Sequence, residues 1–542
     1  MPNDDIIFAD FIIKSDAVYT GLADAPEKAC LAVKGNRIIA VCGEDEVAGF
    51  KDSQTKVYSY GNNLVMAGFI DSHTHFCMGS ALLGDSFVDL SESKSAQDCV
   101  DLIKRHLEKH PDIGHILGWG WFLMNWDPPV NPDKRILDSH FPDIPLYLFS
   151  VDGHTTWANS KALDVCGLTS ATAVAYGEIQ KDENGELTGL LFESDAQTKP
   201  NENAFVCKDE DFEKMLGTIA GCGITSITDL SIPPKLKEEP KTYSRLLGLR
   251  NKGRLTARIH LYPSLGDDGD FTVAKQIREK YQYPDLMFSG LKQFADGTTS
   301  QYTSPMLEPY SDRPGEMGSA YYPPGFFMDI IPKANKEGFS IKIHAIGDRA
   351  IRMVLDAYEA SVKENGLHGI RNCVEHIESI HVSDIKRFGE WGVIASVQPA
   401  HLPLDANEKT MRIGKERARY EWAFRSLLDS GATLAFGADY PVYRLDPMHG
   451  IHAAVTRAFL DGTPVGSSPQ EKITLKESLD AYTQGGAYAL KREHEIGTLE
   501  EGKLADIVVL SDNLFDLEPQ EYLKVEPLMT IMDGKVVYTK ES

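Results

Sequence analysis

Eight short apolar runs lie along the middle of this 542-residue chain, and they constrain its fold more than any other feature. Segments with a helical pattern follow several of them, such as 330–339 (IIPKANKEGF) and 350–366 (AIRMVLDAYEASVKENG). Strands that alternate with helices predict an α/β fold with a parallel sheet. Eight such strands favour a (β/α)8 TIM barrel, with a doubly wound open sheet as the alternative. The runs are LVMAGFI (64–70), GITSITDL (223–230), ARIHLYP (257–263), MFSGLKQFADG (287–297), FSIKIHAIGD (339–348), RNCVEHIES (371–379), VIASVQPA (393–400) and ATLAFGADYPV (432–442).

The two ends of the chain have a strand-rich texture of their own. DFIIKSDAVYTG near the start and PLMTIMDGKVVYTK near the end combine β-branched residues with breaks at Gly and Asp. We therefore expect residues 1–64 and 495–542 to form one small β-sandwich domain from both termini. Residues 65–494 should then form the barrel.

A long gap separates the first apolar run from the second. No barrel strand candidate lies between residues 71 and 222, which is far too long for a loop. We expect a large insertion after barrel strand 1, at about 77–215, and it should stand beside the active site, because barrel sites lie at the C-terminal ends of strands. Its tryptophans, Trp119, Trp121 and Trp126, could line a pocket or form the core of the insertion.

The composition, with 42% hydrophobic and 25% charged residues, is that of a soluble globular protein. A net charge of -25 would repel nucleic acid and anionic membranes, so neither is an expected partner. No apolar run approaches the roughly 18 residues of a membrane span. The first residues, MPNDDIIFADF, are acidic where a secretion signal needs basic ones, and the eight cysteines are scattered singly. We therefore expect a cytoplasmic protein with reduced thiols.

Residues able to bind metal stand at the ends of five of the predicted strands. If the runs form a barrel, these side chains converge on one mouth. Each alone has an ordinary structural explanation, such as a buried histidine or a turn cap, but together they indicate a metal site. A lysine among them is unusual, because an ammonium repels a cation; a buried neutral amine, however, can capture CO2 and become an anionic carbamate. The six residues are His73, His75, Lys292, His344, His376 and Asp439.

Several longer motifs resemble those of the amidohydrolase superfamily, specifically its YtcJ-like branch, which includes N-substituted formamide deformylases. The motifs are GFIDSHTH, LKQFADGTTSQYTSPMLEPY, IKIHAIGDRA, CVEHIE, VIASVQPAH, GATLAFGADYPV and GTLEEGKLADIVVLS. The resemblance implies His73 and His75 on the more buried of two metals, and His344 and His376 on the more exposed one. It also implies a carbamate on Lys292 as the bridge between them and Asp439 as ligand and proton shuttle.

The implied cofactors are two divalent transition metals, zinc first, with manganese, iron or cobalt as alternatives. The implied activity is hydrolysis of a non-peptide amide C–N bond, such as that of an N-substituted formamide, by attack of a metal-bridging hydroxide. Cleavage of a cyclic amide, an imide or an ester would use the same residues. Deamination of an aminated ring is less favoured, because residue 347 is glycine where related deaminases carry a glutamate. A non-catalytic binding protein on this scaffold is the alternative outside the enzymes.

Substrate contacts can be assigned only as candidates. They come from the insertion and from positions near strand ends, and the expected partner is a small amide-like molecule; a homo-oligomer is left open. The candidates are His154, Trp119, Asp296, Gln398 and His401.

Overall fold

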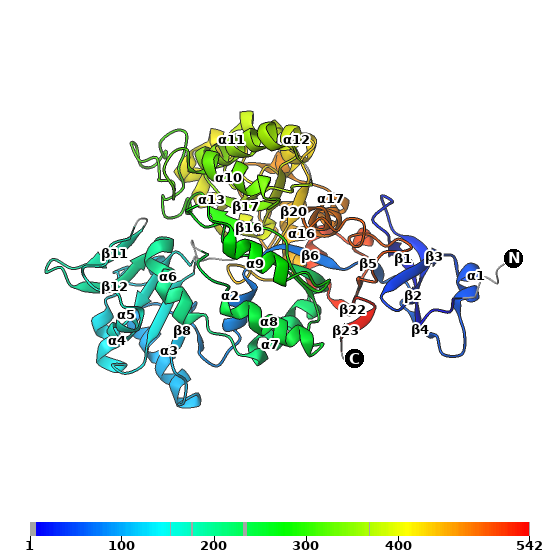
Figure 1. Ribbon diagram of the computed structural model, residues 1–542, viewed down its shortest axis with the longest axis horizontal. Coiled ribbons are helices and arrows are strands. Elements are labelled where there is room, and N and C mark those ends of the chain that lie inside the picture. The colour runs from blue at the N-terminus through cyan, green and yellow to red at the C-terminus, as the bar shows by residue number, and fades with distance from the viewer. Residues whose placement is uncertain (1–6, 152, 175–176, 231–235, 368, 541–542) are drawn as a thin grey trace.

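The computed structural model describes residues 7–151, 153–174, 177–230, 236–367 and 369–540. Residues 1–6, on which part of the argument against a secretion signal rests, lie outside the described chain. Three parts can be distinguished: a central α/β body, a sheet built from both ends of the chain, and an inserted α/β unit (Figure 1). Within the described ranges, no helix is long and apolar enough to cross a membrane.

Eight parallel strands form the centre of the molecule in two arcs. The first arc pairs β6, β13 and β14, and the second pairs β16 to β20 in sequence order. Each run of apolar residues is buried on both faces, as parallel strands covered by helices require. Their bounds are β6 (Phe69–Thr74), β13 (Ile224–Leu230), β14 (Arg258–Tyr262), β16 (Leu291–Phe294), β17 (Ile341–Ala345), β18 (Cys373–His376), β19 (Ile394–Val397) and β20 (Leu434–Phe436).

Backbone hydrogen bonds join the two arcs at both edges. On one side the N–H of Lys292 donates to the carbonyl of Pro263 at 2.8 Å. On the other, the N–H of Asp439 donates to the carbonyl of His73 at 2.7 Å, and that of His75 to Tyr440 at 2.9 Å. The eight strands therefore form a closed ring of backbone hydrogen bonds, and their C-terminal ends meet at one mouth.

Helices follow the strands and cover the outside of the ring. The expected α/β alternation is confirmed. Helix α10 precedes β17 and α11 follows it, and these helices overlap the helical patterns at 330–339 and 350–366. The main covering helices are α7 (Asp209–Gly221), α8 (Lys241–Asn251), α9 (Thr272–Lys280), α10 (Phe326–Lys336), α11 (Asp348–Asn365), α12 (Val382–Trp391) and α16 (Pro447–Thr456).

The first apolar run does not form a single strand. Residues Leu64–Ala67 form β5, which pairs with β1 and β21 of the terminal sheet, whereas β6 of the ring begins at Phe69. Gly68 separates them at a place with no room for a side chain, because a Cβ there would lie 2.3 Å from Cγ2 of Thr225. The expectation that LVMAGFI is wholly the first barrel strand is therefore wrong for its first four residues. The fourth run is also divided, into β15 (Leu286–Phe288) and β16.

Both ends of the chain contribute to one sheet, which confirms a β domain built from both termini, while its form as a sandwich and its bounds at 64 and 495 stay predictions. Its strands belong to a single hydrogen-bonded sheet of order β23-β22-β21-β5-β1-β2-β3, with β4 added beside β1. The register of β1 shifts between Ser15 and Val18, so that its first half pairs with β4 and its second half with β5. The bounds are β1 (Phe11–Tyr19), β2 (Glu27–Lys34), β3 (Arg37–Cys42), β4 (Lys56–Ser59), β21 (Ile507–Leu510), β22 (Pro527–Met532) and β23 (Lys535–Thr539).

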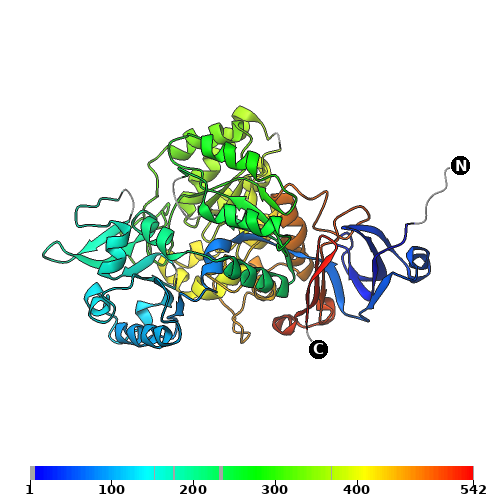
Figure 2. The same cartoon turned by 60° about the horizontal axis from the view of Figure 1, so that its bottom comes forward.

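The inserted unit is a six-stranded sheet with helices, at the end of the molecule opposite the terminal sheet (Figures 1 and 2). Trp121 and Trp126 pack with Trp157 in the core of the inserted unit. Trp119 instead belongs to a cluster of buried apolar side chains that extends from the inserted unit into the ring. Its elements are β7 (Phe87–Asp89), α3 (Ala96–Lys109), β8 (Ile116–Trp121), α4 (Lys134–His140), β9 (Leu146–Ser150), β10 (Thr155–Ala158), α5 (Ser160–Cys166), β11 (Glu178–Lys181), β12 (Leu187–Phe192) and α6 (Glu193–Ala204).

Candidate metal centre

The carboxylate of Asp439 lies between two histidines of β6 and its C-terminal extension. Its Oδ1 atom is 3.3 Å from Nε2 of His73 and 3.1 Å from Nε2 of His75. The ring of His376, at the end of β18, is centred 4.7 Å from that of His73. Donor atoms of His73, His376 and Asp439 all lie within 4.8 Å of one another, and all three residues are buried. The mouth of the ring therefore carries a compact group of nitrogen and oxygen donors.

Two of the strand ends turn their side chains inward through unusual backbone angles. His376 has φ = 76° and Asp439 has φ = 56°, in the left-handed region that residues other than glycine rarely adopt. Such strain tends to persist at functional sites, where the surrounding structure imposes it. Here it stands at two of the six predicted metal-binding positions.

Lys292 and His344 complete the predicted set. The side chain of Lys292 is 1% exposed, and its Nζ has no hydrogen-bond partner among the described residues. Burial lowers the pKa of this amine to about 8, although the carboxylates of Glu375 and Asp439 act in the opposite direction. The ring of His344 is centred 4.4 Å from that of His376, and its Nε2 lies 3.1 Å from the carbonyl oxygen of Gly297.

The ionisation states of His344, His376 and Asp439 match their use as metal ligands. Burial holds the pKa of His344 and that of His376 well below the usual range, so these imidazoles are neutral, as metal ligation requires. Burial alone would raise the pKa of Asp439, but the imidazoles of His73 and His75 outweigh it and bring that pKa well below its ordinary value. Asp439 is therefore a carboxylate.

Unsatisfied buried atoms test whether these residues fit a metal. Nδ1 of His376 and Nζ of Lys292 are buried without a hydrogen-bond partner in the described part of the chain, and Nε2 of His73 and Oδ1 of Asp439 contact each other at 3.3 Å without forming a hydrogen bond. Burying a polar group without a hydrogen bond costs about 1–3 kcal/mol, so a cluster of such groups calls for an occupant. Imidazole and carboxylate donors suit zinc and its first-row neighbours. The residues present fit a divalent transition metal.

A cavity of about 170 Å³ opens beside this group, between the ring and the inserted unit. The metal-binding candidates His75, His344, His376 and Asp439 form part of its wall. Its remaining lining mixes apolar and aromatic residues with polar ones on both sides. The inserted unit supplies Trp119, Phe149, His154, Gln197 and Asn201, and the ring and its loops supply Phe294, Thr298, Tyr321, Ile346, Glu378, His401 and Val442.

A family model described as "Amidohydrolase family" matches residues 57–538, which is most of the chain. The chain belongs to the amidohydrolase family.

Relatives of this amidohydrolase match it over nearly its whole length. Protein LONG AFTER FAR-RED 3 of Arabidopsis thaliana is 29% identical, over 98% of this chain and 92% of the relative. Putative amidohydrolase YtcJ of Bacillus subtilis is also 29% identical, over 90% of this chain and 91% of its own. N-substituted formamide deformylase of Arthrobacter pascens is 27% identical, over 94% of each chain. The resemblance to the YtcJ-like branch is thereby confirmed.

Solved structures share the fold of this amidohydrolase. An uncharacterized metal-dependent hydrolase from Pyrococcus horikoshii superposes with a TM-score of 0.76 at 24% identity, over 94% of this chain and 98% of the other. An adenosine deaminase from Xanthomonas campestris with bound zinc superposes with a TM-score of 0.55 at 14% identity, over 98% and 94%. At these identities the likeness shows the fold alone.

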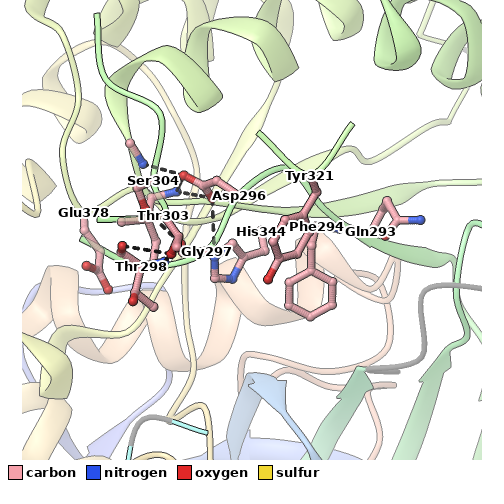
Figure 3. A network of polar contacts seen from close by, with 12 residues as sticks. Gln293, Phe294, Asp296, Gly297, Thr298, Thr303, Ser304, Tyr321, His344 and Glu378 are labelled. Carbon is pink, nitrogen blue, oxygen red and sulfur yellow. Dashed lines mark hydrogen bonds and ion pairs between the residues drawn. The ribbon is translucent and has the colours of Figure 1, made fainter. Parts of the chain in front are cut away.

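The substrate candidates read from the sequence fall into two groups. His154, Trp119 and His401 line the cavity of the amidohydrolase, whereas Asp296 and Gln398 do not. Asp296 instead accepts the backbone N–H groups of Ile346 and Gly347, at 3.0 and 2.8 Å, and lies 3.4 Å from Nε2 of His344 (Figure 3). Burial raises the pKa of its carboxyl to about 8. Asp296 thus holds the loop that follows His344 at the end of β17, a role its sequence position did not reveal.

Glu375 is the main residue of the site that the sequence reasoning missed. Its Oε2 lies 2.5 Å from Nδ1 of His73 and accepts from the hydroxyl of Ser396 at 2.6 Å, while its Oε1 accepts from Lys342 at 3.0 Å. Strand alternation would put Glu375 and His376 on opposite faces. Both nevertheless reach the interior, because the positive φ at His376 breaks that alternation. The one sequence signal for Glu375 was Lys342. It lies two residues before His344, on the same face of the strand, and its buried ammonium needs a carboxylate partner.

Glu378 is a second residue that the sequence reasoning missed. It lies near His401, with 4.0 Å between Oε1 and Nδ1 of the ring, and donor atoms of His376, Glu378 and His401 lie within 4.8 Å of one another. Its carboxylate is also paired with the buried ammonium of Lys409. That positive charge makes the group around Glu378 less suitable for a cation than the one around Asp439.

Proposed function

We propose that this amidohydrolase hydrolyses a non-peptide amide C–N bond, an N-substituted formamide being one candidate, within a (β/α)8 barrel. The single observation that carries the proposal is the position of Asp439. Its carboxylate is within 3.3 Å of two histidines and also lines the cavity, so one group can touch both a metal and a substrate. The name of the formamide deformylase relative, at 27% identity, points in the same direction.

The residues proposed to hold metal are the six predicted ones. His73 and His75 would bind the more buried ion, and His344 and His376 the more exposed one, with Asp439 as a further ligand. Zinc is the first candidate, and manganese, iron or cobalt are alternatives. When bound, two such cations would bring the pKa of a water molecule towards neutrality and polarise a carbonyl group.

Lys292 is proposed to carry a carbamate. Its amine is buried beside the donor group with no hydrogen-bond partner in the described chain, and its pKa of about 8 leaves a useful neutral fraction near neutral pH. A neutral amine can add CO2, and the product replaces a positive charge with an anionic oxygen donor. The charge repulsion that a lysine would otherwise impose on a cation is removed.

Asp439 is proposed to move the proton. Its low pKa makes it a carboxylate in the resting site, able to accept a proton from the attacking water. Delivery of that proton to the leaving nitrogen would then convert a poor leaving group into a neutral amine. The apolar walls from Phe294, Phe149 and Trp119 exclude water around the scissile bond and accommodate an apolar substituent.

Position 347 bears on the deaminase alternative. A Cβ at Gly347 would lie 2.4 Å from the carbonyl oxygen of Pro305, so no larger side chain fits without movement of the loop. The glutamate expected at this place in ring deaminases is therefore sterically excluded here. The same residues would also serve the hydrolysis of cyclic amides, imides and esters.

The test is a substrate panel with metal analysis. Purified protein loaded with zinc or manganese should bind about two ions per chain and cleave at least one member of a panel of N-formyl, N-acyl and cyclic amides. Protein that takes up no metal and cleaves none of them would refute the proposal. One ion per chain with turnover would refute only the two-metal arrangement.

A further inference from the structure

Glu193 joins two cavity residues that come from different parts of the chain. Its Oε2 lies 2.8 Å from Nδ1 of His154 and accepts from the hydroxyl of Tyr321 at 3.2 Å. Glu193 and His154 belong to the inserted unit, whereas Tyr321 lies in the loop between β16 and α10 of the ring. The carboxylate of Glu193 is 7% exposed and does not line the cavity, while His154 and Tyr321 both do. Among the described residues, its carboxylate reaches the cavity through His154 and Tyr321.

The backbone around Glu193 is held in an uncommon conformation. Its φ of 65° lies in the left-handed region, although it is not a glycine, and its N–H donates to the carbonyl of His154 at 3.0 Å. Two glycines pack closely against Glu193. A Cβ added at Gly177 would lie 3.0 Å from the Cβ of Glu193, and a Cβ added at Gly297 would lie 3.2 Å from Oε1 of Glu193. A strained, enclosed residue outside the ligand set invites a functional explanation.

Tyr321 lies on the side of the cavity where His344 stands. The rings of Tyr321 and Phe294 are centred 6.1 Å apart, and those of Phe294 and His344 5.1 Å apart. Figure 3 shows Tyr321, Phe294 and His344 as neighbours at this wall. A group fixed by Glu193 is therefore placed where a substrate would approach His344.

We propose that Glu193 is a positioning residue of the substrate site, whose carboxylate fixes the ring of His154 at the cavity wall and ties the inserted unit to the ring through Tyr321. A carboxylate that accepts from Nδ1 selects one imidazole tautomer and one ring orientation. Without the charge of Glu193, Nδ1 of His154 loses its carboxylate acceptor, so the preference for that tautomer and ring orientation weakens, and binding energy is lost in orienting substrate. The kinetic consequence of this inference rests on the proposed hydrolase function, whereas the fixed orientation of His154 does not.

The kinetic experiment is a double-mutant cycle. It uses metal-loaded Glu193→Gln, His154→Ala and the double variant, on the best amide of the panel. Glu193→Gln should lower kcat/KM by about 10–100-fold, the effect usual for residues that orient a functional histidine. In the His154→Ala background, Glu193→Gln should lower kcat/KM by less than about twofold more, because Glu193 has no imidazole left to orient. Additive losses would overturn the proposal.

The control is Glu202→Gln on the same helix α6, where Glu202 is exposed and pairs with Lys199 at 2.6 Å on the surface. It should leave kcat/KM, metal content and melting temperature unchanged. Glu193→Gln should keep two metal ions, and Tyr321→Phe should give a smaller loss than Glu193→Gln, since it removes only one of the two contacts. A Glu193→Gln variant that loses metal, or whose kinetic loss follows its loss of folded protein, would show a structural role and overturn the inference.

A spectroscopic measurement separates this inference from the proposed function. In protein labelled with ¹⁵N-histidine, with His154→Ala used to assign the signal, His154 should show a single Nδ1-protonated form that becomes mixed in Glu193→Gln. This result is expected whether or not any amide is cleaved. If the panel shows no turnover but the tautomer shifts, the proposed function fails and the positioning of His154 stands; an unchanged tautomer overturns the positioning itself.

Discussion

Oε2 of Glu375 lies 2.5 Å from Nδ1 of His73, and this contact turns the other ring nitrogen of His73 towards Asp439. The ammonium of Lys342 lies 3.0 Å from Oε1 of the same carboxylate, and the side chains of Lys342 and Glu375 are both fully buried. Burial alone would raise the pKa of Glu375, but Lys342 and His73 outweigh it, and the pKa is lowered overall. Glu375 is therefore ionised and orients His73 for ligation.

Glu375→Gln should weaken metal binding by about 10–100-fold, because His73 loses the charged acceptor that fixes its ring. It should also lower the free energy of unfolding by about 3–5 kcal/mol, since Lys342 is left as a buried charge without its counter-ion. Competition with a chromophoric chelator and chemical denaturation measure the two effects. Glu408→Gln, on an exposed pair with Arg412, is the matched control. Unchanged metal affinity in folded Glu375→Gln would contradict the orienting role.

Asp439→Asn should reduce kcat by about 10³-fold or more while the protein stays folded. An amide cannot accept the proton of the attacking water or deliver it to the leaving nitrogen. Steady-state kinetics on the best amide of the panel, with circular dichroism for the fold, give the answer. A folded variant within tenfold of wild-type turnover would rule out the proton-transfer role.

Uptake of metal by the metal-free protein should depend on bicarbonate and should rise with pH. The folded pKa of Lys292 is about 8, below its ordinary value of 10.5, so the amine is an ammonium at lower pH and becomes neutral as the pH rises through 8. Only the neutral amine adds CO2, so bicarbonate-dependent loading should grow between about pH 7 and 9. Titration with zinc at fixed bicarbonate measures this, and ¹³C-bicarbonate should give a carbamate signal. A flat response across this range would contradict the carbamate.

Lys292→Ala removes the proposed bridge. It should lose at least one of two bound ions, and formate or acetate should restore part of the metal content by supplying the missing oxygen donor. Elemental analysis after gel filtration measures the stoichiometry. As a control, Lys275→Ala on helix α9, which breaks an exposed ion pair with Glu337, should keep both ions. Full metal content in Lys292→Ala would show that Lys292 is not a ligand.

Gly68→Ala should destabilise the junction between the terminal sheet and the ring. The new methyl would meet Thr225 at 2.3 Å, an overpacking that costs about 1–3 kcal/mol. Thr225→Ala should partly restore stability in the double variant, because it removes the two atoms nearest to the added methyl. Urea denaturation compares the variants with Gly43→Ala, which has no neighbour within 4 Å. Equal stability of Gly68→Ala and wild type would mean that the two parts separate more easily than the structure indicates.

The apolar runs predicted the α/β alternation, and the strand-rich ends of the chain predicted the terminal sheet. Each run is buried on both faces and each helix on one, so the two periodicities are legible in the sequence. The six metal-binding candidates could be named for the same reason. Parallel strands bring their C-terminal ends together, so polar residues at those ends must meet wherever the strands close into a ring.

What the sequence could not determine depends on contacts between distant segments. The division of LVMAGFI at Gly68 follows from Thr225, more than 150 residues away, and from the strands that pair on either side. The inward position of His376, next to the inward Glu375, follows from the left-handed φ of His376 itself, which no strand pattern predicts.

The link from Glu193 to His154 and Tyr321 likewise exists only once the inserted unit is docked on the ring. The sequence thus placed, by local periodicity, the six metal-binding candidates at the ends of the strands. Tertiary packing decided which way they face and what holds them there.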